Sequence, residues 1–171
     1  MPQIRQLTPA EVDAAAPALA DLTLDCVAGG ASIGFMDGIT AKEAAGFWRG
    51  VAAGAAADGR VVFVAEDAAG LVGTVQMIPA GMPNQPHRFD IAKMQVHRRA
   101  RRQGIGEALM RAAEAEALAR GRTVGVLDTA DATAARLYER CGWIKVGDIP
   151  AYALLPNGEL CGTTFYYRRL A

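Results

Sequence analysis

The chain has 171 residues, 51% of them hydrophobic, which is enough for one domain with a buried core and too few for two. Eighteen Lys and Arg residues balance eighteen Asp and Glu residues, which argues against nucleic acid or an acidic membrane surface as the main partner. The three cysteines, Cys26, Cys141 and Cys161, lie far apart and predict reduced core thiols, not a disulfide framework or a metal site.

The sequence gives no indication of secretion or membrane insertion. The first residues, Met1–Arg5, lack the basic region and apolar run of a signal peptide. The most apolar stretch, Val51–Ala57, is far shorter than the roughly 20 residues that cross a bilayer. We therefore expect a soluble, cytoplasmic protein.

Two helices are predicted in the first third of the chain. Thr8–Glu11 combines a hydroxyl cap, a proline at the first helical position and a glutamate at the third, and the helix should run to about Val27. A second capping box, Thr40 with Glu43, predicts a helix that reaches about Ala57.

Strands and two more helices are predicted after Arg60. The expected strands are Val61–Ala65, Leu71–Ile78, Phe89–Val96, Thr123–Leu127, Trp143–Val146 and Thr163–Arg169. The first two should form a hairpin, and helices are expected at about 104–119 and 131–140. Because no repeat, low-complexity segment or linker interrupts the pattern, residues 1–171 are predicted to form a single α/β domain.

The segment Arg101–Gly106 predicts an anion site, because it joins a strand to a helix whose first amides are unpaired and partly positive. Its glycines let the backbone approach an anion closely, and its arginines add charge. The segment is not a nucleoside-triphosphate P-loop, since Gly-Lys-Ser/Thr is missing, and Leu109 replaces the third glycine of the dinucleotide fingerprint. An ordinary turn with solvated arginines is the alternative.

Arg101, Gly104 and Gly106 occupy the defined positions of the Arg/Gln-x-x-Gly-x-Gly/Ala signature, so the segment resembles the GNAT superfamily of N-acetyltransferases. The resemblance implies a mostly antiparallel mixed sheet with a splayed strand pair, flanked by helices. It also implies that the pyrophosphate of acetyl-CoA binds the turn residues Arg101, Arg102, Gln103, Gly104, Ile105 and Gly106. The pantetheine arm would pair with the end of the preceding strand, Met94, Gln95 and Val96.

A second segment, Ala134–Trp143, resembles the superfamily's Ala-x-x-Leu-Tyr-x-x-x-Gly-Phe motif, with Trp143 in place of Phe. It implies coenzyme contacts at Ala134 and Tyr138. Asp131 stands where many members carry Asn, which puts a coenzyme or water contact of that residue in question.

Three further segments resemble the tabtoxin-resistance branch of the superfamily, whose members acetylate the amine of a β-lactam amino-acid toxin. They are Gly29–Met36, Leu127–Thr129 and Pro150–Tyr152 with Pro156–Gly158. The likeness implies a small amine of the amino-acid type as acceptor, and it points to Asp128 and Asp90, where that branch has acidic residues.

Direct acetyl transfer needs a neutral amine, a stabilised oxyanion and a proton for the departing thiolate. The resemblance implies Tyr138 as the general acid, and Asp128 or Asp90 could take the amine proton or hold the ammonium group. Residues of the apolar loop, Ser32, Ile33, Phe35 and Met36, are expected to line the acceptor pocket. The alternatives are a packed tyrosine, a helix cap at Asp128, a strand-edge charge at Asp90 and a loop that only closes the core.

These features together predict an N-acetyltransferase that moves acetyl from acetyl-CoA to a primary amine, with no metal. A non-catalytic acyl-CoA-binding sensor or regulatory module is the alternative, and transfer of a longer acyl group is a third. No nucleic-acid or membrane partner is expected, and a homodimer through the C-terminal strand is left open.

Overall fold

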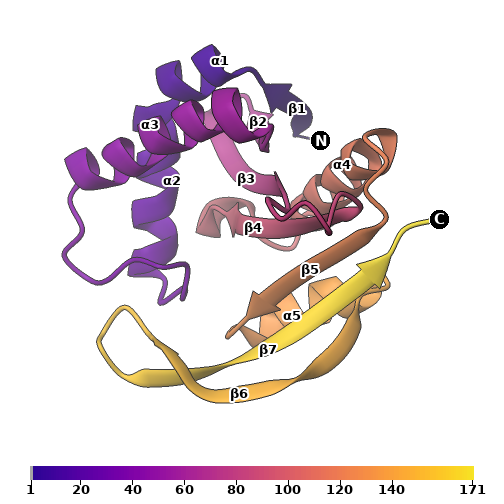
Figure 1. Cartoon of the computed structure of the whole chain (residues 1–171). Coiled ribbons are helices and arrows are strands. Elements are labelled where there is room, and N and C mark those ends of the chain that lie inside the picture. Colours follow the sequence, from indigo (N-terminus) through magenta and orange to yellow (C-terminus); the bar gives the residue numbers. More distant parts are fainter. Residues whose placement is uncertain (1) are drawn as a thin grey trace.

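The computed structural model describes residues 2–171, which form one seven-stranded sheet with helices packed on it (Figure 1). The strands are β1 (Gln3–Leu7), β2 (Val61–Asp67), β3 (Gly70–Pro79), β4 (Arg88–Val96), β5 (Val124–Thr129), β6 (Ile144–Leu154) and β7 (Leu160–Arg169). Their order is β1-β2-β3-β4-β5-β7-β6, and only the β4–β5 pair is parallel. The predicted α/β class with a mostly antiparallel mixed sheet is confirmed.

The helices cover both faces of the sheet. They are α1 (Pro9–Ala14), α2 (Ala16–Ala28), α3 (Ala41–Asp58), the short 3₁₀ helix η1 (Arg98–Ala100), α4 (Ile105–Ala119) and α5 (Ala132–Arg140). Successive β2 side chains point to opposite faces, so Val62 and Val64 pack with α1, α2 and α3, whereas Val61 and Phe63 pack with α4. The sheet therefore separates two apolar cores.

Both predicted capping boxes form, but the first predicted helix is wrong in its extent. The Thr8 and Thr40 hydroxyls accept hydrogen bonds from the amides of Glu11 and Glu43, and α3 ends within one residue of its expected end. The expected helix to Val27 is divided at Ala15 into α1 and α2. The division follows from Pro17, which lacks the N–H that a continuous helix would need.

The strand predictions are confirmed for the β2–β3 hairpin, β4, β5 and β7, and two points need correction. β1 was not expected, because its Gln-Ile-Arg-Gln-Leu sequence lacks a clear apolar run, yet it pairs antiparallel with β2. β6 extends to Leu154, well beyond the expected Val146. Most of its side chains are exposed and its pairing with β7 is interrupted by irregularities, so no regular apolar alternation marks it in the sequence.

Strands β4 and β5 separate along their length, which confirms the expected splayed pair. Only Arg88–Asp90 pair with Val124–Val126, while β4 continues to Val96 and β5 to Thr129. A bulge also interrupts the pairing of β4 with β3, and Lys93 at the bulge has a positive φ of 50°. The backbone edge of Ile91–Val96 that faces β5 is thus left unpaired; we call this opening the splay.

The cysteines, the helix lengths and the acidic and sulfur side chains can be described for the same residues. The cysteines are free thiols, two of them buried, and burial raises the pKa of the Cys26 thiol to about 11. Within residues 2–171, no helix is both long and apolar enough to cross a bilayer. The same residues contain no cluster of three or more His, Cys, Asp and Glu that could bind a metal ion.

Candidate active site

The turn between η1 and α4 has the backbone of an anion site. Arg102 and Gly104 adopt left-handed conformations, with φ of 63° and 76°, and Gly104 begins α4 without a side-chain cap. No residue in 2–171 accepts a hydrogen bond from the backbone amides of Ile105 and Gly106. The first amides of this 15-residue helix are therefore free to bind an anion.

The six turn residues differ in what they can contribute. Arg101, Arg102 and Gln103 are exposed, and the Arg101 Nε donates to the Val96 carbonyl at 3.3 Å, which ties the turn to the end of β4. The Ile105 side chain is only 3% exposed and packs in the core, so only its backbone can meet a ligand.

Gly106 lies where α4 and α5 approach one another closely. A Cβ at this position would lie 2.8 Å from the Leu137 Cδ2, which is closer than ordinary contact. The second glycine of the signature therefore permits helix packing, whereas the first provides the left-handed turn.

The end of β4 presents backbone, not side chains, to the splay. Met94 and Val96 pack against the α4 core, and Gln95 is 2% exposed, with its Oε1 accepting a hydrogen bond from the Thr23 hydroxyl at 3.1 Å. A ligand at the splay can therefore meet the backbone of these three residues, although the Val96 carbonyl already accepts from the Arg101 Nε. The resemblance implied the same kind of contact for the pantetheine arm.

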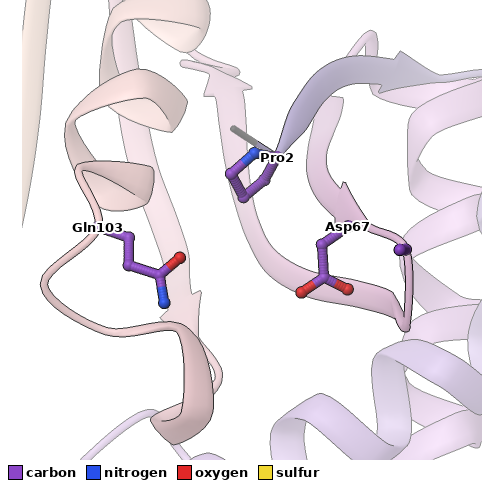
Figure 2. Close-up of a pocket in the computed structure, with 4 residues that line it drawn as sticks. Pro2, Asp67 and Gln103 are labelled. Atoms are coloured by element: carbon purple, nitrogen blue, oxygen red, sulfur yellow. The ribbon is translucent and has the colours of Figure 1, made fainter.

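A hollow of about 420 Å³ lies beside the turn, lined by Pro2, Asp67, Ala68 and Gln103. Figure 2 shows Gln103 on one side of it and Pro2 and Asp67 on the other. Asp67 is already paired with the Arg99 guanidinium, which holds the pKa of this carboxyl below its usual range. The hollow lies on the β2 side of the turn, whereas the splay lies on its β5 side.

Tyr138, on α5, is a buried tyrosine whose hydroxyl has no protein partner in the described part of the chain. It is 5% exposed and its ring lies 6.2 Å from that of Tyr166, while no residue in 2–171 forms a hydrogen bond with its hydroxyl. Burial raises the pKa of Tyr138, and the carboxylates of Asp131 and Asp128 raise it further. The phenol therefore keeps its proton at neutral pH, and Asp128 acts on it electrostatically.

Asp90 and Asp128 lie on one face of the sheet but have different surroundings. Asp90 is the register partner of Val126, and Asp128 follows two residues later on the same face. The Arg88 Nη1 donates to the Asp90 Oδ1 at 2.7 Å in an ion pair, whereas Asp128 accepts only from the Thr163 hydroxyl, also at 2.7 Å. No cation in residues 2–171 forms an ion pair with Asp128, so it is the carboxylate that remains available.

The interpretation of Asp128 as a helix cap is wrong, because Asp131 caps α5. The Asp131 Oδ1 accepts from the amides of Thr133 and Ala134, the latter at 2.9 Å. The Ala134 N–H is therefore occupied, and a coenzyme contact at Ala134 would have to use its methyl group.

The loop that carries Ser32, Ile33, Phe35 and Met36 bridges the α2–α3 helices and the β6–β7 turn (Figure 1). The Ser32 hydroxyl donates to the Leu154 carbonyl at 3.4 Å, and the Asp37 amide donates to the Pro156 carbonyl at 2.9 Å. Phe35 turns inward and packs edge-on against Phe47, with ring centroids 5.1 Å apart. Ile33 is half-buried and Met36 is 43% exposed.

Two residues near this loop were missed from sequence. The Lys93 Nζ lies 5.6 Å from the ring centroid of Phe35 and 5.4 Å from that of Phe47. Burial lowers the pKa of Lys93, while the charge of Asp128 opposes this shift. No local signal marks Lys93 or Phe47, since their meeting depends on how α3 packs over β4.

A second hollow, of about 300 Å³, opens at the C-terminal end of β5. It is lined by Thr129, Ala130, Asp148, Ile149, Pro150, Gly162, Thr163 and Thr164. Because Thr163 also donates to Asp128, this hollow adjoins the available carboxylate.

A family model described as "Acetyltransferase (GNAT) domain" matches residues 58–145, just over half of the chain. The match includes the turn, the splay, Asp90, Asp128 and Tyr138.

Solved structures of similar fold cover nearly the whole chain. A ribosomal-protein-alanine N-acetyltransferase from Brucella melitensis has 22% identity and a TM-score of 0.79, over 98% of this chain and 99% of that one. YncA from Salmonella typhimurium, solved with its cofactor acetyl-CoA, has 18% identity and a TM-score of 0.80, over 100% of this chain and 95% of that one. A phosphinothricin acetyltransferase from Sinorhizobium meliloti, in complex with acetyl-CoA, has 18% identity and a TM-score of 0.79, over 99% and 89%. With this shared fold and the family match, the chain belongs to the GNAT acetyltransferase family.

Proposed function

We propose that this protein transfers an acetyl group from acetyl-CoA to the primary amine of a small, amino-acid-like molecule. The observation that carries the proposal is the position of the splay. The unpaired backbone edge of β4 leads directly into the free amides at the start of α4. A pantetheine arm and a pyrophosphate can therefore be bound by one continuous stretch of chain, with the thioester carbonyl beside backbone N–H donors.

The amine attacks the acetyl carbon directly in this proposal. A bond forms between the amine nitrogen and the acetyl carbon, and the carbon–sulfur bond breaks. Tyr138 gives its proton to the departing thiolate, and Asp128, directly or through water, takes the surplus proton from the nitrogen. Both side chains then recover their starting protonation by exchange with solvent, so the products are an N-acetyl amine and a free thiol.

Asp128 is favoured over Asp90 as the proton acceptor. The Asp90 carboxylate already faces the Arg88 guanidinium, whereas Asp128 is exposed and held only by Thr163. Two of the similar structures are described as acetyltransferases for phosphinothricin and for ribosomal-protein alanine. The likeness to the tabtoxin-resistance branch supports an acceptor of the amino-acid type, whereas the second description names a protein acceptor, which the peptides in the assay below represent.

The proposal is tested by measuring thiol release from acetyl-CoA with a panel of amino acids, aminoglycosides, polyamines and peptides, with product masses determined in parallel. Thiol release with an acetylated small amine is the expected result. Tight coenzyme binding by calorimetry without any product would favour the acyl-CoA sensor instead. Propionyl-CoA and succinyl-CoA in the same assay test the third alternative, a longer acyl group.

We also expect the protein to act in the cytoplasm, without nucleic acid or membrane as partner. A homodimer stays a prediction. β6 is the outer strand of the sheet and exposes Ile144 and Val146, and light scattering after gel filtration would give the mass in solution.

A further inference from the structure

The bulge in β4 places Lys93 on the same face of the sheet as Asp90 and Asp128. Phe89 and Ile91 point into the α4 core, so Asp90 lies on the opposite face, and the bulge adds a residue that puts Lys93 on that face too. Asp90 and Asp128 share the face as well, through the register partner Val126. A lysine and the available carboxylate thus lie on one side of the sheet, where the two strands separate.

The Lys93 ammonium is desolvated without an ionic partner. The residue is half-buried, and no carboxylate of residues 2–171 forms an ion pair with it, because Asp90 is paired with Arg88. The rings of Phe35 and Phe47 face the Nζ and offset part of the lost hydration through cation–π attraction. They supply no hydrogen-bond acceptor, so the N–H donors of this half-buried ammonium are available to water or to a ligand.

The surrounding loop holds the ammonium in place without covering it with a polar group. Gly34 lies against it, since a Cβ at this position would be 3.2 Å from the Nζ. The loop is itself fixed to the β6–β7 turn through Ser32 and Asp37. The ammonium is thus bordered by two rings and a glycine, with no protein acceptor for its N–H groups among residues 2–171.

We propose that Lys93 binds an anionic group of the acceptor, and that the acceptor is therefore a small molecule bearing a carboxylate as well as the reacting amine. This inference rests on the proposed function and assigns the acceptor class of the same site. Asp128 attracts the ammonium end of such a molecule and Lys93 its carboxylate end, so the cleft matches a zwitterion. Phe35 and Phe47 would contact the apolar part between or beside the two charges.

The test compares matched acceptors in the thiol-release assay with wild-type protein and Lys93→Met. The acceptors are the twenty α-amino acids and, for each, the carboxamide that lacks the negative charge. Wild type should prefer the amino acids, and Lys93→Met should lower the amino-acid-to-carboxamide ratio of kcat/KM about tenfold or more, mainly through KM. Lys93→Arg should retain part of the preference, because it keeps the charge.

Lys42→Met serves as the matched control, since Lys42 is an exposed lysine at the start of α3 and should leave the ratio unchanged. Circular dichroism and calorimetric affinity for acetyl-CoA establish that Lys93→Met is folded and binds the coenzyme. An equal loss of activity on both acceptor classes would overturn the inference and assign Lys93 a general catalytic or structural role. Preferred acetylation of uncharged amines by wild type would overturn it while leaving the acetyltransferase intact, and no thiol release with any amine would overturn both proposals.

Discussion

The coenzyme side and the acceptor side of the cleft are built in different ways. The proposed coenzyme side is one continuous segment, Met94–Gly106, which offers backbone amides and a left-handed turn. The proposed acceptor side consists of side chains from separate parts of the chain, including Phe35, Phe47 and Asp128. Backbone geometry fixed by local sequence can be preserved while distant side chains change, so one coenzyme site can serve many acceptors.

Tyr138 is proposed to act where the thioester of the coenzyme meets the acceptor amine. Removing its hydroxyl should lower activity more than any other substitution considered below. Tyr138→Phe should lower kcat about a hundredfold or more, because the thiolate loses its proton donor, with little change in acetyl-CoA affinity. Steady-state kinetics and calorimetry measure the two quantities. Tyr166→Phe is the control, since Tyr166 is a buried neighbour whose hydroxyl donates to Glu139. Normal turnover in Tyr138→Phe would remove it as the acid.

Substituting the two carboxylates separately tests the acceptor side. Asp128→Asn should lower kcat/KM about tenfold to a hundredfold, because the amine loses its proton acceptor or ammonium partner. Asp90→Asn should have the smaller effect, since the Asp90 charge is already neutralised by Arg88. The ranking of the two variants under identical substrate conditions decides the assignment, and a reversed ranking would make Asp90 the base.

Placing a side chain on Gly104, whose backbone is left-handed, tests the coenzyme side. Gly104→Val should weaken acetyl-CoA binding about tenfold or more, because a β-branched residue strongly disfavours the φ of 76°. Gly121→Val is a close control: Gly121 has a φ of 73°, and both positions are open to an added side chain. Both variants should lose similar stability, and only Gly104→Val should lose calorimetric affinity. Equal affinity in the two would contradict the phosphate-binding turn.

The splay closes where Arg88–Asp90 pair with Val124–Val126. A substitution at this paired end should have the smallest effect of the four. A Cβ on Gly125 would lie 2.6 Å from the Phe89 Cζ and 2.7 Å from the Trp143 ring. Gly125→Ala should therefore lower the free energy of unfolding by about 1–3 kcal/mol, measured by urea denaturation. Gly147→Ala, where an added Cβ meets open space, should change it far less.

Much of the fold could be predicted because its signals are local. The Thr40–Glu43 capping box predicts where α3 begins. The succession of a strand, several arginines and two glycines predicts the turn before α4. Pro17, which divides α1 from α2, is a local signal of the same kind, so one continuous helix to Val27 is disfavoured by the sequence itself. The polar sequence of β1 carries no signal without its partner β2.

Most contacts on the acceptor side could not be predicted from the sequence. Phe35 was predicted to line the pocket, but Phe47 and Lys93 belong to a helix face and a strand bulge that become adjacent only in the folded molecule. The different surroundings of Asp90 and Asp128 depend in the same way on Arg88 and Thr163. Ion pairs and hydrogen bonds between distant residues leave no periodic pattern in the chain.

The position of β7 bears on how the protein is made. β7 follows β6 in the chain but lies between β5 and β6 in the sheet, and it carries the threonine that holds Asp128. As the polypeptide leaves the ribosome, β5 therefore has one unpaired edge until Leu160–Arg169 emerges. The turn Arg101–Gly106 is translated well before that moment, so the proposed acceptor site would be completed last.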